Sequence, residues 1–168
     1  IKIFFLDKLI KINYNILTKH MREKMIKKLY TKIFKLADYA TTKNIRKMHY
    51  QTPFSLYEGK DLIYGKNNKI NRFDIYYPKI YEDKKLPTIL NIHGGGYVAG
   101  SKENESEFCR RIATKGFCVI NMEYTLADKE GFPKPVFEVF DLFNFIENNS
   151  SISSHIDYDN FFIAGDSA

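Results

Sequence analysis

Three short stretches of the chain, residues 86–93, 117–124 and 160–164, are almost continuously apolar. Such runs are typical of strands that are covered on both faces of a sheet. Two amphipathic segments, residues 104–115 and 133–148, separate them and have the apolar spacing of helices. Strands that alternate with helices predict a parallel sheet with right-handed crossovers, so the expected fold class is α/β, with three layers.

The two predicted helices carry signals at their ends. Asn104, with Glu107 three residues later, resembles a capping box, and Gly116 is a natural C-terminal stop. Pro133 is at the start of the second helix. The buried stripe expected for that helix contains Val136, Phe137, Phe140, Phe143 and Ile146.

A β-hairpin is expected before the first buried strand. Residues 62–64 and 70–77 are strand-like, and the polar segment 65–68 between them is a turn signal. In the second run Phe73, Ile75 and Tyr77 alternate with Asp74 and Tyr76. This alternation predicts an antiparallel edge hairpin with one solvated face.

Residues 1–50 have a different pattern, which predicts a basic amphipathic helix or helix pair. Met25, Leu29, Ile33, Leu36 and Ala40 recur at steps of three and four residues, and lysines fill much of the remainder. Such a segment could pack on its own domain, cap a pocket, or lie on an anionic membrane surface. The predicted organisation is therefore a helical segment over 1–50 and an α/β domain over 51–168.

Charge is distributed unevenly between these two parts. Residues 1–50 contain 13 Lys and Arg against three acidic residues, a net charge of +10, whereas residues 51–168 have a net charge of −4. The domain itself is mildly acidic, so no nucleic-acid partner is expected. Cys109 and Cys118 do not form a disulfide framework and are expected to be reduced thiols in or near the core.

The segment His93-Gly94-Gly95-Gly96-Tyr97 directly follows the first buried strand. Three consecutive glycines let the backbone approach a ligand closely and present amide N–H groups to it. Such donors stabilise the oxyanion of an acyl-transfer intermediate. The alternative is a simple strand-to-loop turn with no chemical role.

A second glycine-containing segment, Gly165-Asp166-Ser167-Ala168, directly follows the last buried strand. A sharp turn between a strand and a helix would expose the serine hydroxyl at the top of the sheet, as in the pattern G-x-S-x-G. The alternative is a plain turn in which Ser167 caps the following helix.

Both segments fall at the carboxyl edge of the same predicted sheet, where the chemistry of α/β proteins is found. Together they predict serine acyl transfer, with Ser167 as the nucleophile. Gly94, Gly95, Gly96 and the amide of Ala168 are the expected oxyanion-hole groups, with Gly95 and Gly96 favoured. Asp166 is not expected to be the catalytic acid, because neighbouring residues on a sharp turn point apart, and it is expected to hydrogen-bond within its loop.

These motifs resemble those of the hormone-sensitive-lipase-like carboxylesterases, which are α/β hydrolases, over residues 75–168. The family's Y-R-L-A-P-E segment is similar to residues 124–129, its F-P-A-A-x-x-D helix start to residues 132–138, and its I-D-P-x-R strand approach to residues 156–160. This sequence departs from the family pattern at Thr125 (for Arg), Asp128 (for Pro), Glu138 (for Asp) and Tyr158 (for Pro).

The resemblance implies hydrolysis of a carboxylic ester through an acyl-enzyme on Ser167. It also implies a structural role for His93, which holds the oxyanion loop, and a cap formed in part by N-terminal helices. In this superfamily the catalytic acid and histidine follow the nucleophile. We therefore expect the sequence to be the N-terminal part of a longer hydrolase, cut after the nucleophile turn and inactive in this form.

Several other classes are not expected from the sequence. No Cys, His and carboxylate spacing suggests a metal site, no G-x-G-x-x-G suggests a dinucleotide, and no cofactor is expected. No apolar run reaches the roughly 20 residues of a membrane span, and no signal peptide is expected, so the predicted location is cytoplasmic. A non-catalytic binding protein on a hydrolase scaffold remains the alternative function, and membrane or polyanion binding through residues 1–50 is a third.

Overall fold

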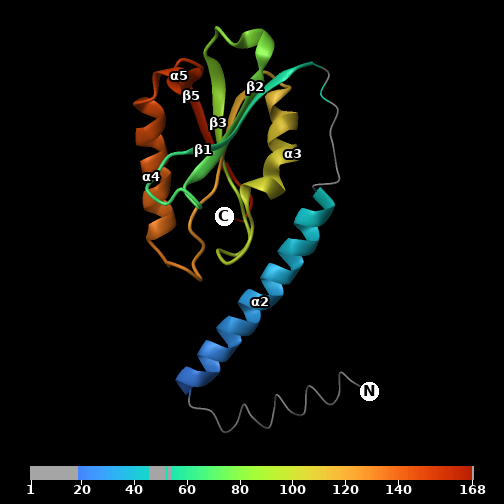
Figure 1. The fold of residues 1–168 in the computed structure, drawn as a ribbon, viewed down its shortest axis with the longest axis vertical. Helices are drawn as coiled ribbons and strands as arrows, with labels where there is room; N and C mark the ends of the chain where they lie inside the picture. Colours follow the sequence, from blue (N-terminus) through green and yellow to red (C-terminus); the bar gives the residue numbers. More distant parts are fainter. Residues whose placement is uncertain (1–18, 46–51, 53, 168) are drawn as a thin grey trace.

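A computed structural model describes residues 19–45, 52 and 54–167 (Figure 1). A five-stranded sheet with the order β1-β2-β4-β3-β5 forms its centre. The strands are β1 (Leu56–Ile63), β2 (Arg72–Pro78), β3 (Leu86–Ile92), β4 (Cys118–Met122) and β5 (Ile156–Gly165). β3 pairs in parallel with β4 and β5, whereas β2 pairs antiparallel with β1 and β4. The three-layer α/β fold with an N-terminal antiparallel hairpin is thus confirmed.

Helices cover both faces of the sheet (Figure 1). α3 (Lys102–Ala113) packs on one face, and α4 (Lys134–Glu147) packs on the other, followed by the short α5 (Ser150–Ser153). A one-turn 3₁₀ helix, η1 (Lys79–Tyr81), precedes β3. α2 (Lys19–Ile45) lies outside this sandwich. None of the helices in the described ranges is long and apolar enough to cross a membrane.

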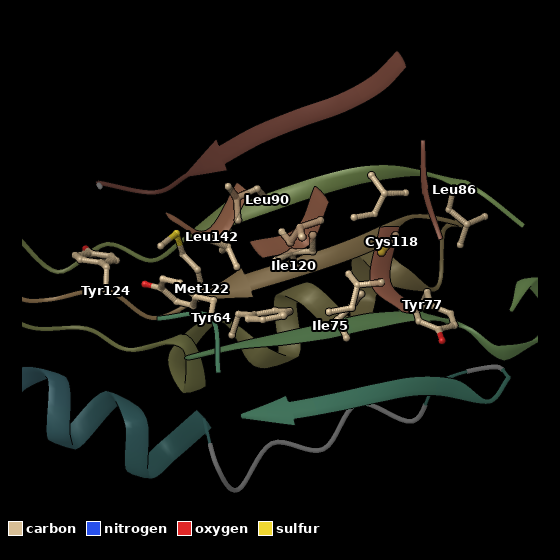
Figure 2. Packing of buried hydrophobic residues seen from close by; sticks show 14 residues of the cluster. Tyr64, Ile75, Tyr77, Leu86, Leu90, Cys118, Ile120, Met122, Tyr124 and Leu142 are labelled. Carbon is tan, nitrogen blue, oxygen red and sulfur yellow. The ribbon is translucent and has the colours of Figure 1, made fainter. Parts of the chain in front are cut away.

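Alternation along the strands divides the buried side chains between the two faces. Ile75 and Ile120 belong to the larger core cluster, where they pack with Leu142 of α4 (Figure 2). Their neighbours in sequence, Tyr76 and Val119, belong to a smaller cluster with Cys109 and Ala113 of α3. The period of two in β2 and β4 therefore supplies apolar side chains to both helical layers. Both cysteines are buried free thiols, as expected.

The expectation of a solvated face on the hairpin is wrong for its second strand, although several residues of β1, at the edge of the sheet, are exposed. β2 lies between β1 and β4, and six of its seven residues are buried. Asp74 has the appearance of a surface residue in the sequence, but it is only 2% exposed and accepts a hydrogen bond of 2.8 Å from Lys102 of α3. An ion pair between two buried side chains therefore replaces the expected contact with water.

The capping box expected for α3 is wrong, and the buried stripe expected for α4 is wrong except at Ile146 and the partly buried Phe143. α3 begins at Lys102 with Ser101 as its N-cap, so Asn104 lies inside the helix and hydrogen-bonds Asp38 of α2 instead of forming a capping box. In α4, the buried residues are Glu138, Leu142 and Ile146, whereas Val136, Phe137 and Phe140 of the expected stripe are exposed. The apolar arc of α4 is wide, and the part of the helix that faces the sheet is the one that contains the buried Glu138.

The last strand is longer than expected, and its pairing with the neighbouring strand is irregular at a polar segment. β5 begins at Ile156, and its pairing with β3 shifts between Pro87 and Thr88. The side chain of Asp157 accepts hydrogen bonds from the amide of Asp159 (3.0 Å) and from Asn160 (2.8 Å) at this point. After the shift, the strands run in register to the carboxyl edge of the sheet.

The buried pair of Asp74 and Lys102 gives a test of the fold. Replacing Asp74 with Ala leaves the Lys102 ammonium, which is 4% exposed, without its closest partner. We expect a loss of about 3 kcal/mol in the free energy of unfolding, at the lower end for breaking a buried pair, because Asp61 and Glu103 also contact Lys102. Urea denaturation measures this loss. Glu103→Gln is the matched control and should cost less than about 1 kcal/mol, and equal losses in the two variants would contradict the assignment.

Candidate active site

The sheet brings the two glycine-containing segments together. β3 and β5 are adjacent and parallel, and Ile92 at the end of β3 pairs with Gly165 at the end of β5. The next residues, His93 and Asp166, therefore leave the sheet side by side at its carboxyl edge. In parallel sheets this edge is where ligands bind.

The backbones of the two segments touch at Gly94. A Cβ atom on Gly94 would overlap the carbonyl oxygen of Asp166 and would come within 3.2 Å of the carbonyl oxygen of Ser167. Only a residue without a side chain allows this approach. The geometry thus places the triple-glycine loop directly against the turn that carries Ser167.

The glycine loop is a tight turn in left-handed backbone conformations. Gly95 has a φ of 136° and Gly96 a φ of 59°, both in the region that favours glycine, and the turn is closed by a hydrogen bond of 3.1 Å from the amide of Ala99 to the carbonyl of Gly95. Within the described ranges, no group accepts a hydrogen bond from the amides of Gly95 or Gly96. These two donors are available to a ligand.

Ser167 itself has a left-handed backbone. Its φ of 56° is uncommon for a residue with a side chain, and such strain clusters at functional sites. Asp166 lies near Glu105 of α3: burial raises the pKa of Glu105, and the negative charge of Asp166 raises it further. The hydrogen-bonding role expected for the Asp166 side chain stays a prediction. Ala168 lies outside the described residues.

His93 is fixed from two sides. Its Nδ1 is 2.9 Å from the carbonyl oxygen of Gly94, and its Nε2 is 2.9 Å from a carboxylate oxygen of Glu123. Both partners only accept hydrogen bonds, so this geometry favours the protonated ring, in which both nitrogens donate. Burial opposes this charge, but the hydrogen bond and the charge of Glu123 outweigh it and raise the pKa of His93. A ring in this state has no lone pair with which to act as a general base.

Tyr124 completes the support of His93. The two rings are stacked with their centroids 4.2 Å apart, and the Tyr124 hydroxyl donates a hydrogen bond of 2.7 Å to the carbonyl of His93. Glu123 also accepts a hydrogen bond of 3.2 Å from the amide of Lys102, in the first turn of α3. Glu123 therefore joins the end of β4, the glycine loop and the start of α3. The sequence analysis did not single out Glu123, although it directly precedes Tyr124, the first residue of the segment similar to Y-R-L-A-P-E.

Two departures from the family pattern turn out to be partners. Glu138 of α4 accepts hydrogen bonds of 2.7 Å from both the amide and the hydroxyl of Thr125, and a third of 2.8 Å from Asn71. Glu138 is 1% exposed, so these bonds satisfy a buried carboxylate that would otherwise have no partner in water. This network fixes the loop after β4, which begins with Glu123 and Tyr124.

Hollows lie on both sides of the glycine loop. One, of about 320 Å³, is lined mainly by apolar side chains at the ends of β3 and β5 and the start of α4. The lining residues are Ile92, Tyr97, Tyr124, Pro135, Val136, Val139, Ile163, Ala164 and Gly165. The other, of about 730 Å³, lies between α2 and the loop and includes Lys35, Tyr39, Ala99 and Ser101. Phe34 of α2 lies against Gly96, 3.2 Å from where a Cβ would be.

The contact at Gly94 can be tested by adding one methyl group. Gly94→Ala would force the glycine loop and the Ser167 turn apart, so we expect a loss of about 3 kcal/mol or more in the free energy of unfolding. Gly131→Ala is the matched control, because a Cβ there meets nothing within 4 Å. Thermal or urea denaturation compares the two. A Gly94→Ala protein as stable as the Gly131→Ala protein would show that the two segments do not touch.

The clamp on His93 gives a pH prediction. Because the folded-state pKa of His93 is raised above its unfolded value of about 6.5, its contribution to stability is complete below that pH and is lost as the pH rises through the folded pKa. Glu123→Gln removes the charge, so the pKa of His93, followed by NMR titration of its ring, should fall and this pH-dependent stability should shrink. Glu130→Gln, at an exposed position, should leave both unchanged. An unaltered His93 titration in Glu123→Gln would contradict the clamp.

Comparisons with known proteins agree with this fold. Residues 73–168, more than half of the chain, match the BD-FAE family. "Probable carboxylesterase 16" of Arabidopsis thaliana is 37% identical over 75 residues, which are 42% of this chain and 17% of that protein. An esterase of Gibberella moniliformis is 33% identical over 73 residues, 43% of this chain and 23% of its own length.

Among solved structures, esterase B of Lactobacillus rhamnosis has the same fold. It superposes with a TM-score of 0.73 at 21% identity, over 86% of this chain and 45% of that one. The chain therefore spans less than half the length of the proteins to which it is similar. By its match over residues 73–168, its sheet order and its two carboxyl-edge segments, this chain belongs to the BD-FAE family and has an α/β-hydrolase fold.

Proposed function

We propose that the protein hydrolyses carboxylic esters, with Ser167 as the nucleophile. The observation that carries the proposal is the contact between Gly94 and the backbone of Asp166 and Ser167. It sets a strained, exposed serine beside a glycine loop in which the amides of Gly95 and Gly96 have no internal partner in the described ranges. The carboxylesterase and esterase relatives support the same chemistry.

In the proposed reaction, the Ser167 hydroxyl attacks the carbonyl carbon of the ester. The carbonyl oxygen becomes an oxyanion, which accepts hydrogen bonds from the amides of Gly95 and Gly96 and from that of Ala168. The proton of the serine is transferred to the departing alcohol, and an acyl-enzyme remains. Water then attacks this acyl-enzyme and releases the carboxylic acid.

The base for this reaction is not found among the three described histidines. His93 is doubly engaged by Gly94 and Glu123. His155 is at the edge of the sheet opposite the carboxyl edge, where its carbonyl accepts a hydrogen bond from the amide of Leu86 at the start of β3. His20 is in the first turn of α2, far from the sheet (Figure 1). We therefore propose that the acid and the histidine follow Ala168, in the chain order of the superfamily.

The proposal predicts different behaviour for the 168-residue chain and for the protein that contains the sequence following Ala168. The longer protein should hydrolyse p-nitrophenyl acetate and should be labelled by a fluorophosphonate on Ser167, located by peptide mass spectrometry. Ser167→Ala should lower its kcat by about 10⁶, because the members of a triad act as a unit. The 168-residue chain should show no turnover that depends on Ser167.

Ser153→Ala is the matched control, because Ser153 is in α5, away from the carboxyl edge, and should keep full activity. A folded longer protein that is not labelled would favour a non-catalytic binding protein instead. Turnover by the 168-residue chain that is lost in Ser167→Ala would show that the base lies within it.

A further inference from the structure

α2 is an amphipathic helix whose polar side faces the domain. Its half-buried residues recur every three or four positions, as Thr31, Phe34, Asp38 and Thr42. Asp38 and Thr42 hydrogen-bond Asn104 of α3, and Phe34 lies against Gly96. This mostly polar stripe holds the helix against the glycine loop and α3.

The apolar face of α2 points the other way, into solvent. This face consists of Met25, Ile26, Leu29, Ile33 and Leu36, all of which are exposed, from 37% for Met25 to 70% for Leu36. A surface helix of a globular protein normally turns such a stripe toward its own core. Figure 1 shows the helix extending beyond the sandwich, and the exposed fractions show that the described part of the domain leaves this face uncovered.

The same helix is strongly basic. It contains eight Lys and Arg against two acidic residues, a net charge of +6 over 27 residues. Lysines border the apolar face: Lys24, Lys28, Lys32 and Lys35 line a hollow that also includes Leu36. Large apolar side chains flanked by lysines are the composition of helices that lie in a membrane interface.

We propose that the apolar face of α2 binds an anionic lipid surface. Charge favours a lipid surface over a second copy of the chain as the partner of this face. Residues 1–50 have a net charge of +10, so two copies that met through this face would bring like charges together. Lipid headgroups with a net negative charge complement the lysines, and the boundary between headgroups and acyl chains accommodates the exposed apolar side chains.

Binding in this orientation has a consequence for the candidate site. Phe34, on the domain-facing side of α2, contacts Gly96. The glycine loop would therefore lie just beneath a helix that rests on the lipid. The proposal does not depend on the ester chemistry, because vesicle binding and Ser167 labelling are separate measurements.

Co-sedimentation of the whole chain with vesicles tests the proposal. We expect at least about tenfold tighter binding to vesicles of phosphatidylcholine mixed with phosphatidylserine than to phosphatidylcholine alone. Binding should weaken as NaCl is raised, because salt screens exposed charges. No binding, or equal binding to both vesicles, would overturn the proposal.

Two variants separate the apolar and the electrostatic contributions. The triple variant Leu29→Gln, Ile33→Gln, Leu36→Gln should lose vesicle binding while circular dichroism shows an unchanged fold. Its matched control carries three substitutions at similarly exposed apolar positions away from α2: Ile80→Gln, Phe137→Gln and Phe140→Gln. The control should bind as the parent does, and equal binding by both triple variants would contradict the assigned face.

The charge variant Lys24→Gln, Lys28→Gln, Lys32→Gln keeps the apolar face and should lose the preference for anionic vesicles. It decides the question even if the first triple variant fails to fold. Analytical ultracentrifugation provides the competing outcome. A dimer that the apolar-face variant abolishes, with no vesicle binding by the parent chain, would assign this face to a second copy instead.

Discussion

The structure depends on one backbone contact, between Gly94 and the carbonyl of Asp166. It exists because β3 and β5 are neighbours in a parallel sheet and end in register, with Ile92 opposite Gly165. Any side chain at position 94 would separate the two turns. The glycines are thus required both for the left-handed conformation of their loop and for the position of Ser167 relative to that loop.

Around this contact, polar groups hold the loops at the carboxyl edge. His93 is tied to its own loop through Gly94 and to the end of β4 through Glu123, which raises the His93 pKa that burial alone would lower. Glu123 extends the connection to the first turn of α3 through the amide of Lys102. A rigid, charge-paired support of this kind preorganises the loop amides, which is how electrostatic stabilisation avoids a reorganisation cost.

The sequence was sufficient to predict the architecture and the juxtaposition of the two motifs. The apolar run 86–93 is covered on both faces, and the two glycine-containing segments follow adjacent strands. The run 160–164, expected to be covered in the same way, is instead mostly exposed in β5, at the edge of the described sheet. The failures were polar residues that are buried with a partner distant in sequence. Asp74 pairs with Lys102 across 28 positions, and Glu138 pairs with Thr125 and Asn71. Pattern analysis reads such residues as solvated because the partner is not visible from local spacing.

The same limitation explains α2. Its periodicity predicted a helix, and residues 19–45 form one, but the periodicity does not indicate which side meets the domain. Specific polar contacts to Asn104, together with Phe34 on Gly96, hold the polar stripe against the domain. The apolar face is left for another surface, and the roles of the remaining residues in 1–50 lie outside the described ranges.

The most direct test of the central claim is the structure of the longer protein with a phosphonate bound covalently to Ser167. The account predicts a phosphoryl oxygen at about 2.7–3.1 Å from the amide nitrogens of Gly95 and Gly96, the distance expected for oxyanion-hole donors. An adduct on a different residue, or a phosphoryl oxygen turned away from both glycine amides, would contradict it.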